Sequence, residues 1–193
     1  MIIRERILQA AAAAFERDGL DGLSMRKVAA AVGLTPMALY RHFADKQALI
    51  DAITLQGLEA WRARLEQVRA DDPRDWLQAM SATFLDFALE APRQYEAAFH
   101  LRARTARRFP DDFTAGRSPP AAMVFARIEA AKAAGLLDDT PTEDVVMSIW
   151  AMAQGLVDLY RAGRFAGDEG DFRAFYGAAL KRCLASFRPG APS

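Results

Sequence analysis

Apolar residues recur at intervals of three and four along most of the chain, the spacing that places them on one face of an α-helix. The first such stripe contains Ile3, Ile7, Ala11 and Phe15, and it ends before Gly19. No segment alternates apolar and polar residues convincingly over the length of a β-strand. The pattern therefore predicts an all-α protein that begins with an amphipathic helix.

Two short helices are expected next, because each has its own boundary signals. Ser24 is a typical N-cap for the first, and Gly33 can adopt the left-handed conformation that ends it. Thr35 can cap the second, and Pro36 suits its first position. Two short helices joined through one glycine have the proportions of a helix-turn-helix.

Longer helices account for the rest of the pattern. Asp45 can cap a helix that reaches about residue 70, and prolines and glycines divide the chain beyond it. The other helices expected are residues 74–89, 93–107, 121–134, 142–162 and 171–187. The stretches 108–120, 135–141 and 163–170 are expected to be loops.

The charge balance excludes a bulk attraction to nucleic acid or to a membrane. The 193 residues carry 25 basic and 25 acidic side chains, so any such attraction must be local. The first fifty residues have seven basic side chains against five acidic ones. With 52% hydrophobic and 26% charged residues, the composition is that of a folded globular protein and not of a disordered one.

The cysteine content and the apolar runs bear on location. Cys183 is the only cysteine, which favours a reducing compartment. The first residues carry charges where a signal peptide needs an apolar run, and no stretch has the ~20 apolar residues of a membrane span. We expect a cytoplasmic protein with no membrane partner.

The second short helix has a face that its own packing does not need. Leu39 and Phe43 can pack against the first helix of the chain. Met37, Tyr40 and Arg41 lie toward the other side. In a helix-turn-helix the N-terminal part of the second helix enters the DNA major groove, so this face is a candidate for base contacts.

The run ILQAAAAAFERDGLDGLSMRKVAAAVGLTPMALYRHFADKQALIDAI resembles the N-terminal DNA-binding region of the TetR family. The likeness extends to the glycine turn, the Leu-Tyr-x-His-Phe run and the Asp-Lys that follows. It implies a three-helix DNA-binding domain followed by a helical bundle for ligand binding and dimerisation. The division expected is a helix-turn-helix domain at residues 1–50, a regulatory and dimerisation domain at 51–187 and a C-terminal tail at 188–193.

The same resemblance implies which residues meet DNA. It places some side chains at base edges and others at groove or phosphate positions. The DNA-binding residues expected are Arg26, Thr35, Pro36, Met37, Ala38, Tyr40, Arg41, His42 and Lys46. Ala38 stands where the family often has threonine or serine, so a methyl contact with thymine is expected there in place of a hydroxyl contact with phosphate.

The helix expected at residues 142–162 carries a narrow stripe of small residues that permits close approach of another helix, within the subunit or across a twofold axis. The family resemblance favours a homodimer through the last two helices. The interface residues expected are Ser148, Ala151, Gly155, Ala162 and Phe175. Trp150, Gln154 and Gly155 also resemble a Trp-His-Gly (WHG) regulatory-domain subgroup, with Gln154 in place of histidine.

An effector site is expected in the helical domain, because small-molecule sites are mostly apolar cavities with a few polar groups. The ligand-binding residues expected are Trp61, Phe84, Phe87, Tyr95, Phe99, His100, Met123 and Trp150, although each taken singly is a better candidate for the core. The basic run at residues 101–108 is interpreted as a solvated face rather than a phosphate clamp.

These features together predict a DNA-binding transcriptional regulator, a repressor that binds a palindromic double-stranded DNA operator as a homodimer. A small, largely apolar effector would release it. An all-α enzyme and a helical protein-interaction adaptor are the alternatives. No HExxH, GxSxG or phosphate-loop pattern occurs, so we expect no catalytic residue, metal or cofactor. Retention of DNA in a gel shift distinguishes the regulator from the adaptor.

Overall fold

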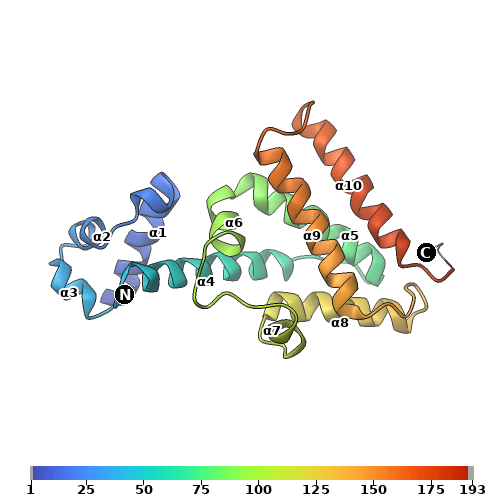
Figure 1. Cartoon of the computed structure of the whole chain (residues 1–193), viewed down its shortest axis with the longest axis horizontal. Coiled ribbons are helices and arrows are strands. Elements are labelled where there is room, and N and C mark those ends of the chain that lie inside the picture. Colours follow the sequence, from blue (N-terminus) through green and yellow to red (C-terminus); the bar gives the residue numbers. More distant parts are fainter. Residues whose placement is uncertain (1, 191–193) are drawn as a thin grey trace. The chain divides into compact units, whose positions relative to one another are not determined.

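The computed structural model describes residues 2–190, and these residues form α-helices and no β-strand (Figure 1). The all-α prediction is therefore confirmed. The helices are α1 (Ile3–Gly22), α2 (Met25–Ala31), α3 (Pro36–Tyr40), α4 (Lys46–Leu65), α5 (Pro73–Glu90), α6 (Pro92–Phe99), α7 (Asp111–Thr114), α8 (Pro119–Ala133), α9 (Thr142–Arg161) and α10 (Glu169–Ser186). The last three residues of the expected tail, 191–193, lie outside the described residues.

The helices form two compact units, and the chain passes from one to the other more than once. The first unit contains the residues up to Trp61 together with Ala91–Ala106. The second contains Arg62–Glu90 and the residues from Arg107 onward. The segment around α6, which the sequence places in the regulatory domain, thus folds with the N-terminal helices.

The first unit is built on the buried face of α1. Ile7, Ala11 and Phe15 are almost completely buried, as the periodic stripe predicts. They share one core with α2, α3 and the first half of α4, and with Ala97 and Leu101 from the segment around α6. Burial of this much apolar surface is what holds the two short helices in place, because helices of five to seven residues have little stability alone.

A close crossing of α4 and α6 depends on Gly57. A Cβ atom at this position would lie 2.7 Å from the backbone nitrogen of Ala98 and 2.8 Å from the carbonyl oxygen of Gln94. Only glycine has no side chain to occupy that space, so the backbone of α6 rests directly on α4. Helix α6 also contacts α1, where Gly19 has a φ of +66° and lies against the side chain of Arg93.

Several helix ends differ from the periodic pattern. The helix expected at residues 93–107 ends at Phe99, so its second half was wrongly predicted. Beyond it the backbone is held by side chains of α4: the N–H of Arg104 donates to Asp51, and the amide of Gln47 donates to the carbonyl of Arg102. Helix α4 ends at Leu65 and not at residue 70, and the expected loop at 108–120 contains the short helix α7.

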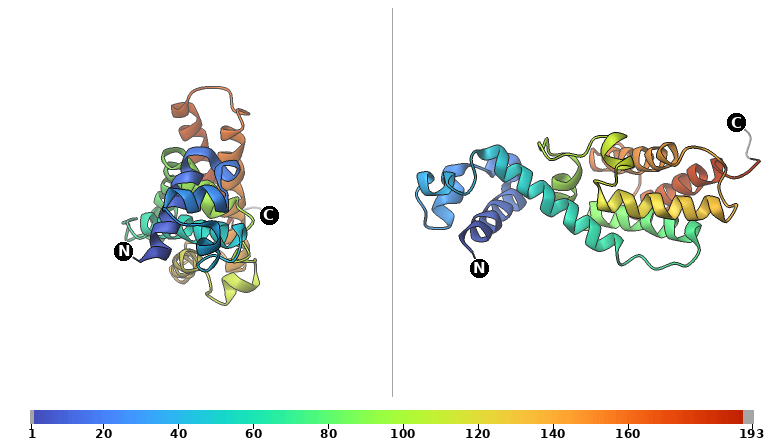
Figure 2. Two further views of the ribbon diagram at one scale, coloured as in Figure 1. Left: turned by 90° about the vertical axis from the view of Figure 1, so that its left-hand side faces the viewer. Right: turned by 90° about the horizontal axis from the view of Figure 1, so that it is seen from below.

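The second unit is a bundle in which α5 and α9 each contact α8 and α10 (Figure 2). Its core includes Trp76, Phe84 and Ile149, all buried. Tyr160 of α9 stacks on Phe172 of α10, with ring centroids 4.1 Å apart and planes 6° from parallel. No helix among residues 2–190 is both long enough and apolar enough to cross a membrane.

Candidate nucleic-acid interface

The two short helices have the boundaries that the sequence predicts. The hydroxyl of Ser24 accepts the N–H of Lys27 at 3.2 Å, and the hydroxyl of Thr35 accepts the N–H of Ala38 at the same distance. Gly33 has a φ of +72°, and no atom lies near enough to meet a Cβ there. Left-handed backbone, not lack of space, therefore makes glycine the suitable residue at this turn.

Helix α3 separates a buried face from an exposed face. Leu39 is fully buried and Phe43, just beyond the helix, is 2% exposed. Met37 is 72% exposed and Tyr40 is 48% exposed, although both are large and apolar. Both side chains are therefore accessible to another molecule.

Most of the other residues expected at DNA are exposed as well. Arg26, Pro36, Arg41 and His42 are exposed, and Ala38 is half-buried. Neither arginine has an ion pair or hydrogen bond within the part of the chain that is described. Both guanidinium groups are therefore available to acceptors on another molecule.

The start of α4 is fixed to the end of α1. Asp45 caps α4 by accepting the N–H of Ala48 at 2.6 Å, as predicted from the sequence. The ammonium group of Lys46 donates to the carbonyl oxygen of Leu20 at 3.1 Å. Lys46 is exposed, but it also has an internal role that its position in the motif does not reveal.

A cluster around Arg104 connects the segment after α6 to the start of α4. The Arg104 guanidinium contacts Asp51 at 2.8 Å and Asp45 at 3.2 Å. Partial burial raises the pKa of Asp51, but the hydrogen bonds from Arg104 and Gln47 lower it more, so the pKa lies below its ordinary value. The basic run is exposed as expected, but the sequence analysis did not identify these ion pairs.

The residues expected to bind a ligand are divided between the two units. Trp61, Tyr95, Phe99 and His100 belong to the first unit, where the ring of Tyr95 lies 5.4 Å from that of Phe99 and 5.1 Å from that of His100. Phe84, Phe87, Met123 and Trp150 belong to the second. His100 is exposed; Phe99, Met123 and Trp150 are half-buried and the others are buried. Their role in ligand binding stays a prediction.

The stripe expected at a dimer interface is exposed. Ser148, Ala151, Gly155 and Ala162 all face away from the core of the second unit, and Phe175 is 44% exposed. Sequence reasoning missed two larger apolar side chains on the same helix: Met152 is 37% exposed and Leu159 is 54% exposed. Their spacing of seven residues, two turns of helix, places them on one face and could have identified them from the sequence.

Two family models match the chain. Residues 7–53 match the model described as bacterial regulatory proteins of the tetR family. Residues 77–183, more than half of the chain, match a tetracyclin repressor-like C-terminal domain. The chain belongs to the TetR family. The description of the C-terminal model does not name the Trp-His-Gly subgroup, and that finer resemblance stays a prediction.

This TetR family member is similar in sequence to known regulators and similar in fold to solved structures. The transcriptional regulator UidR of Escherichia coli K12 is 41% identical over 64 residues, and this match spans about a third (33%) of each chain. A protein of unknown function from Rhodococcus sp. RHA1 has the same fold, with a TM-score of 0.80, 24% identity and 98% and 97% of the two chains covered. A single-residue variant of TetR from Acinetobacter baumannii AYE, solved in complex with minocycline, has a TM-score of 0.67 at 21% identity over the whole of both chains.

Proposed function

We propose that this TetR family member is a DNA-binding transcriptional regulator that acts as a repressor in the cytoplasm. The observation that supports it is the two-sided character of α3. Leu39 is fully buried while Met37 and Tyr40 are largely exposed next to free arginine side chains. Such a surface suits the edges of base pairs between two phosphate backbones.

The residues divide into two roles at the DNA. Arg26, Pro36 and Met37 are proposed to meet base edges in the major groove. Tyr40 and Arg41, with the other expected residues, are proposed to hold the groove wall and phosphates. Arginine can bond two acceptors of guanine at once, and loss of such a pair costs ~1–3 kcal/mol of discrimination.

The active form is proposed to be a homodimer formed by α9 and α10. The exposed stripe with Gly155 at its centre lets a second helix approach closely, and Leu159 and Phe175 supply apolar surface beside it. A twofold dimer reads a palindromic operator. Its half-site centres are expected to be one helical turn of DNA apart, ~34–36 Å, or a multiple of that.

A small, largely apolar effector is proposed to release the repressor. The support for coupling lies in the first unit, where α6 rests on α4 at Gly57 and the segment after α6 is tied to the start of α4 through Arg104. A movement of α6 would therefore shift α4 and also α3, the reading helix, which precedes α4 and is proposed to enter the major groove. The effector can do this only if it binds the DNA-released arrangement more tightly.

The proposal is tested by measuring binding to DNA upstream of the protein's own gene as a function of salt. Fluorescence anisotropy of a labelled fragment gives the slope of log K against log salt, which reflects the number of phosphate contacts. Arg41→Ala is expected to reduce that slope by about 1. Arg17→Ala, an exposed arginine of α1 that pairs with Asp18, is the matched control and should leave it unchanged. Failure of the wild-type protein to retain any fragment at low salt would overturn the proposal.

A further inference from the structure

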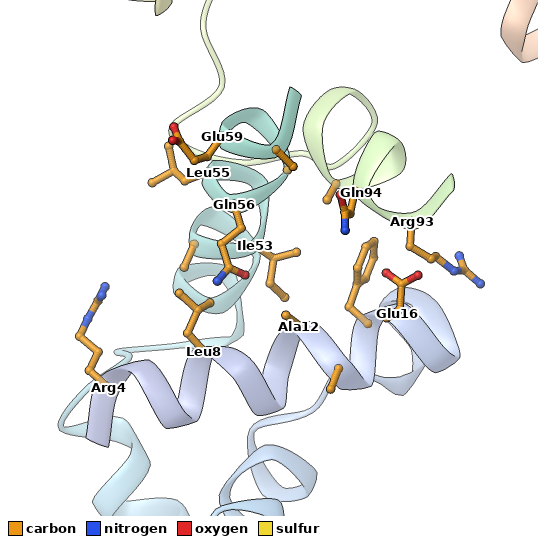
Figure 3. A pocket seen from close by; sticks show the side chains of 16 residues that line it. Arg4, Leu8, Ala12, Glu16, Ile53, Leu55, Gln56, Glu59, Arg93 and Gln94 are labelled. Carbon is orange, nitrogen blue, oxygen red and sulfur yellow. The ribbon is translucent and has the colours of Figure 1, made fainter. Parts of the chain in front are cut away.

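A groove lies in the first unit between α1, α4 and α6 (Figure 3). Its volume is about 670 Å³, which is within the ~300–1,000 Å³ typical of small-molecule sites. All of its lining residues belong to this one unit. None of them is a residue expected to bind ligand from the sequence, so the groove is a separate candidate.

The floor of the groove is apolar along its length. Leu8 and Ala12 of α1 face Ile53 of α4 across it, and Ala97 of α6 also lines it. Leu55, on the rim, is 46% exposed. An apolar body laid along this floor would cover surface that is now in contact with water, which is favourable at ~25 cal/mol for each Å².

The charged groups at the ends of the groove are not equivalent. Arg93 is occupied, because it forms an ion pair with Glu96 at 2.7 Å. Arg4, at the other end, lies over the ring of Phe43, 4.8 Å from its centroid. Glu16 has no hydrogen bond or ion pair with any described residue. Of these three groups, Glu16 alone has no partner among the described residues.

We propose that this groove binds an elongated organic cation, with its apolar body along Leu8, Ala12 and Ile53 and its ammonium group at Glu16. The amides of Gln56 and Gln94 extend into the groove from α4 and α6 and can accept or donate hydrogen bonds along the ligand (Figure 3). An anionic head group at the same end of the groove would meet the carboxylate of Glu16 and be disfavoured.

Binding at this groove would affect the reading helix, because α1 and α4 pack on both sides of it in one core. A ligand between α1, α4 and α6 would favour one spacing of these helices over others. This consequence rests on the DNA-binding function proposed above, whereas binding of the cation does not.

The test uses calorimetry of the full chain with decylammonium, with decanoate and decanol as probes of equal length, all below the concentrations at which they form micelles. Wild type is expected to bind decylammonium more tightly than decanoate. Glu16→Gln should weaken the binding of decylammonium by about threefold to fivefold, which is the effect of losing a partly exposed ion pair of up to ~1 kcal/mol. Glu16→Lys should invert the preference in favour of decanoate.

Two further variants make the result specific to the groove. Asp21→Lys makes the same charge change on α1 at an exposed position outside the groove, and it should leave the preference unchanged. Ala12→Phe fills the floor and should abolish binding of both ions, while a circular dichroism spectrum like that of the wild type shows that the variant is folded. Equal binding of decylammonium and decanoate by wild type, inversion by Asp21→Lys, or full binding by Ala12→Phe would each overturn the proposal. If the wild type binds decylammonium but no DNA, the proposed function fails and the site stands.

Discussion

Replacing Gly57 by alanine tests the α4–α6 crossing. Alanine is the better helix former by ~1 kcal/mol, so the substitution should stabilise α4 considered alone. The new Cβ, however, would lie 2.7 Å and 2.8 Å from two backbone atoms of α6, against 3.4 Å or more in ordinary contact. The helices must therefore separate by about 0.7 Å, because no side-chain rotation can relieve a contact with backbone.

We expect the clash to outweigh the helix propensity. Overpacking of this kind costs ~1–3 kcal/mol, and a contact with rigid backbone belongs at the upper end. The net loss is about 2 kcal/mol, which corresponds to a decrease of ~4–8 °C in Tm for a chain of this size. Thermal unfolding followed by circular dichroism measures it.

The control for this experiment is Ala63→Gly, which makes the reverse exchange at an exposed position of the same helix. It should cost up to ~1 kcal/mol through helix propensity alone. If Gly57→Ala were as stable as wild type, or more stable, the close approach of α4 and α6 would be refuted.

Three further substitutions test the remaining contacts. Asp51→Asn should lower the free energy of unfolding near pH 7 in denaturant melts. The difference should decrease as the pH falls from about 4 through the depressed folded pKa of Asp51, because the stabilisation is complete above the unfolded pKa of 3.8 and is lost when the folded carboxyl is protonated; a difference that does not decrease in acid would contradict this. Tyr176→Phe should cost ~0.5–1.5 kcal/mol in denaturant unfolding, since its hydroxyl donates to the carbonyl of Ser81 at 3.0 Å, and an unchanged midpoint would show that this bond adds nothing. Leu159→Glu should convert the proposed dimer to monomers in analytical ultracentrifugation, because a charge would replace an apolar side chain that is 54% exposed in the single chain. A stable dimer of this variant would place the interface elsewhere.

The helix-turn-helix could be predicted from sequence because its signals are local. Ser24, Thr35 and Asp45 each cap a helix a few residues away, and Gly33 forms its turn without help from distant residues. Propensity and capping chemistry act over a single turn, so the sequence contains all of the information needed. The exposed positions of Met37 and Tyr40 follow from the same short helix.

The segment around α6 could not be predicted in the same way. Arg104 pairs with Asp51, a residue 53 positions earlier. The spacing of apolar residues along the chain gives no information about such a distant partner. Gly57 lies inside a helix where glycine is unfavourable alone, and only the backbone of α6 above it explains the choice. The helix expected to continue past Phe99 stops because its backbone groups find partners on α4, which is a tertiary effect.

The groove between α1, α4 and α6 was also beyond the reach of the sequence. Leu8 and Ala12 read as part of an ordinary apolar stripe, and nothing in the pattern separates the residues that are covered from those that line an open groove. Glu16 reads as one solvated charge among several. Only the placement of α6 against α1 and α4 brings these residues to one site.

Selection of DNA from a random pool by the purified protein, followed by sequencing of the retained fragments, tests the proposed reading surface most directly. We expect an inverted repeat whose half-sites are one helical turn apart or a multiple, and we expect Arg26→Ala to relax the preference at particular positions in each half. Enrichment of no sequence, or an identical preference after the exposed residues of α3 are replaced by alanine, would contradict the assignment of this face to DNA.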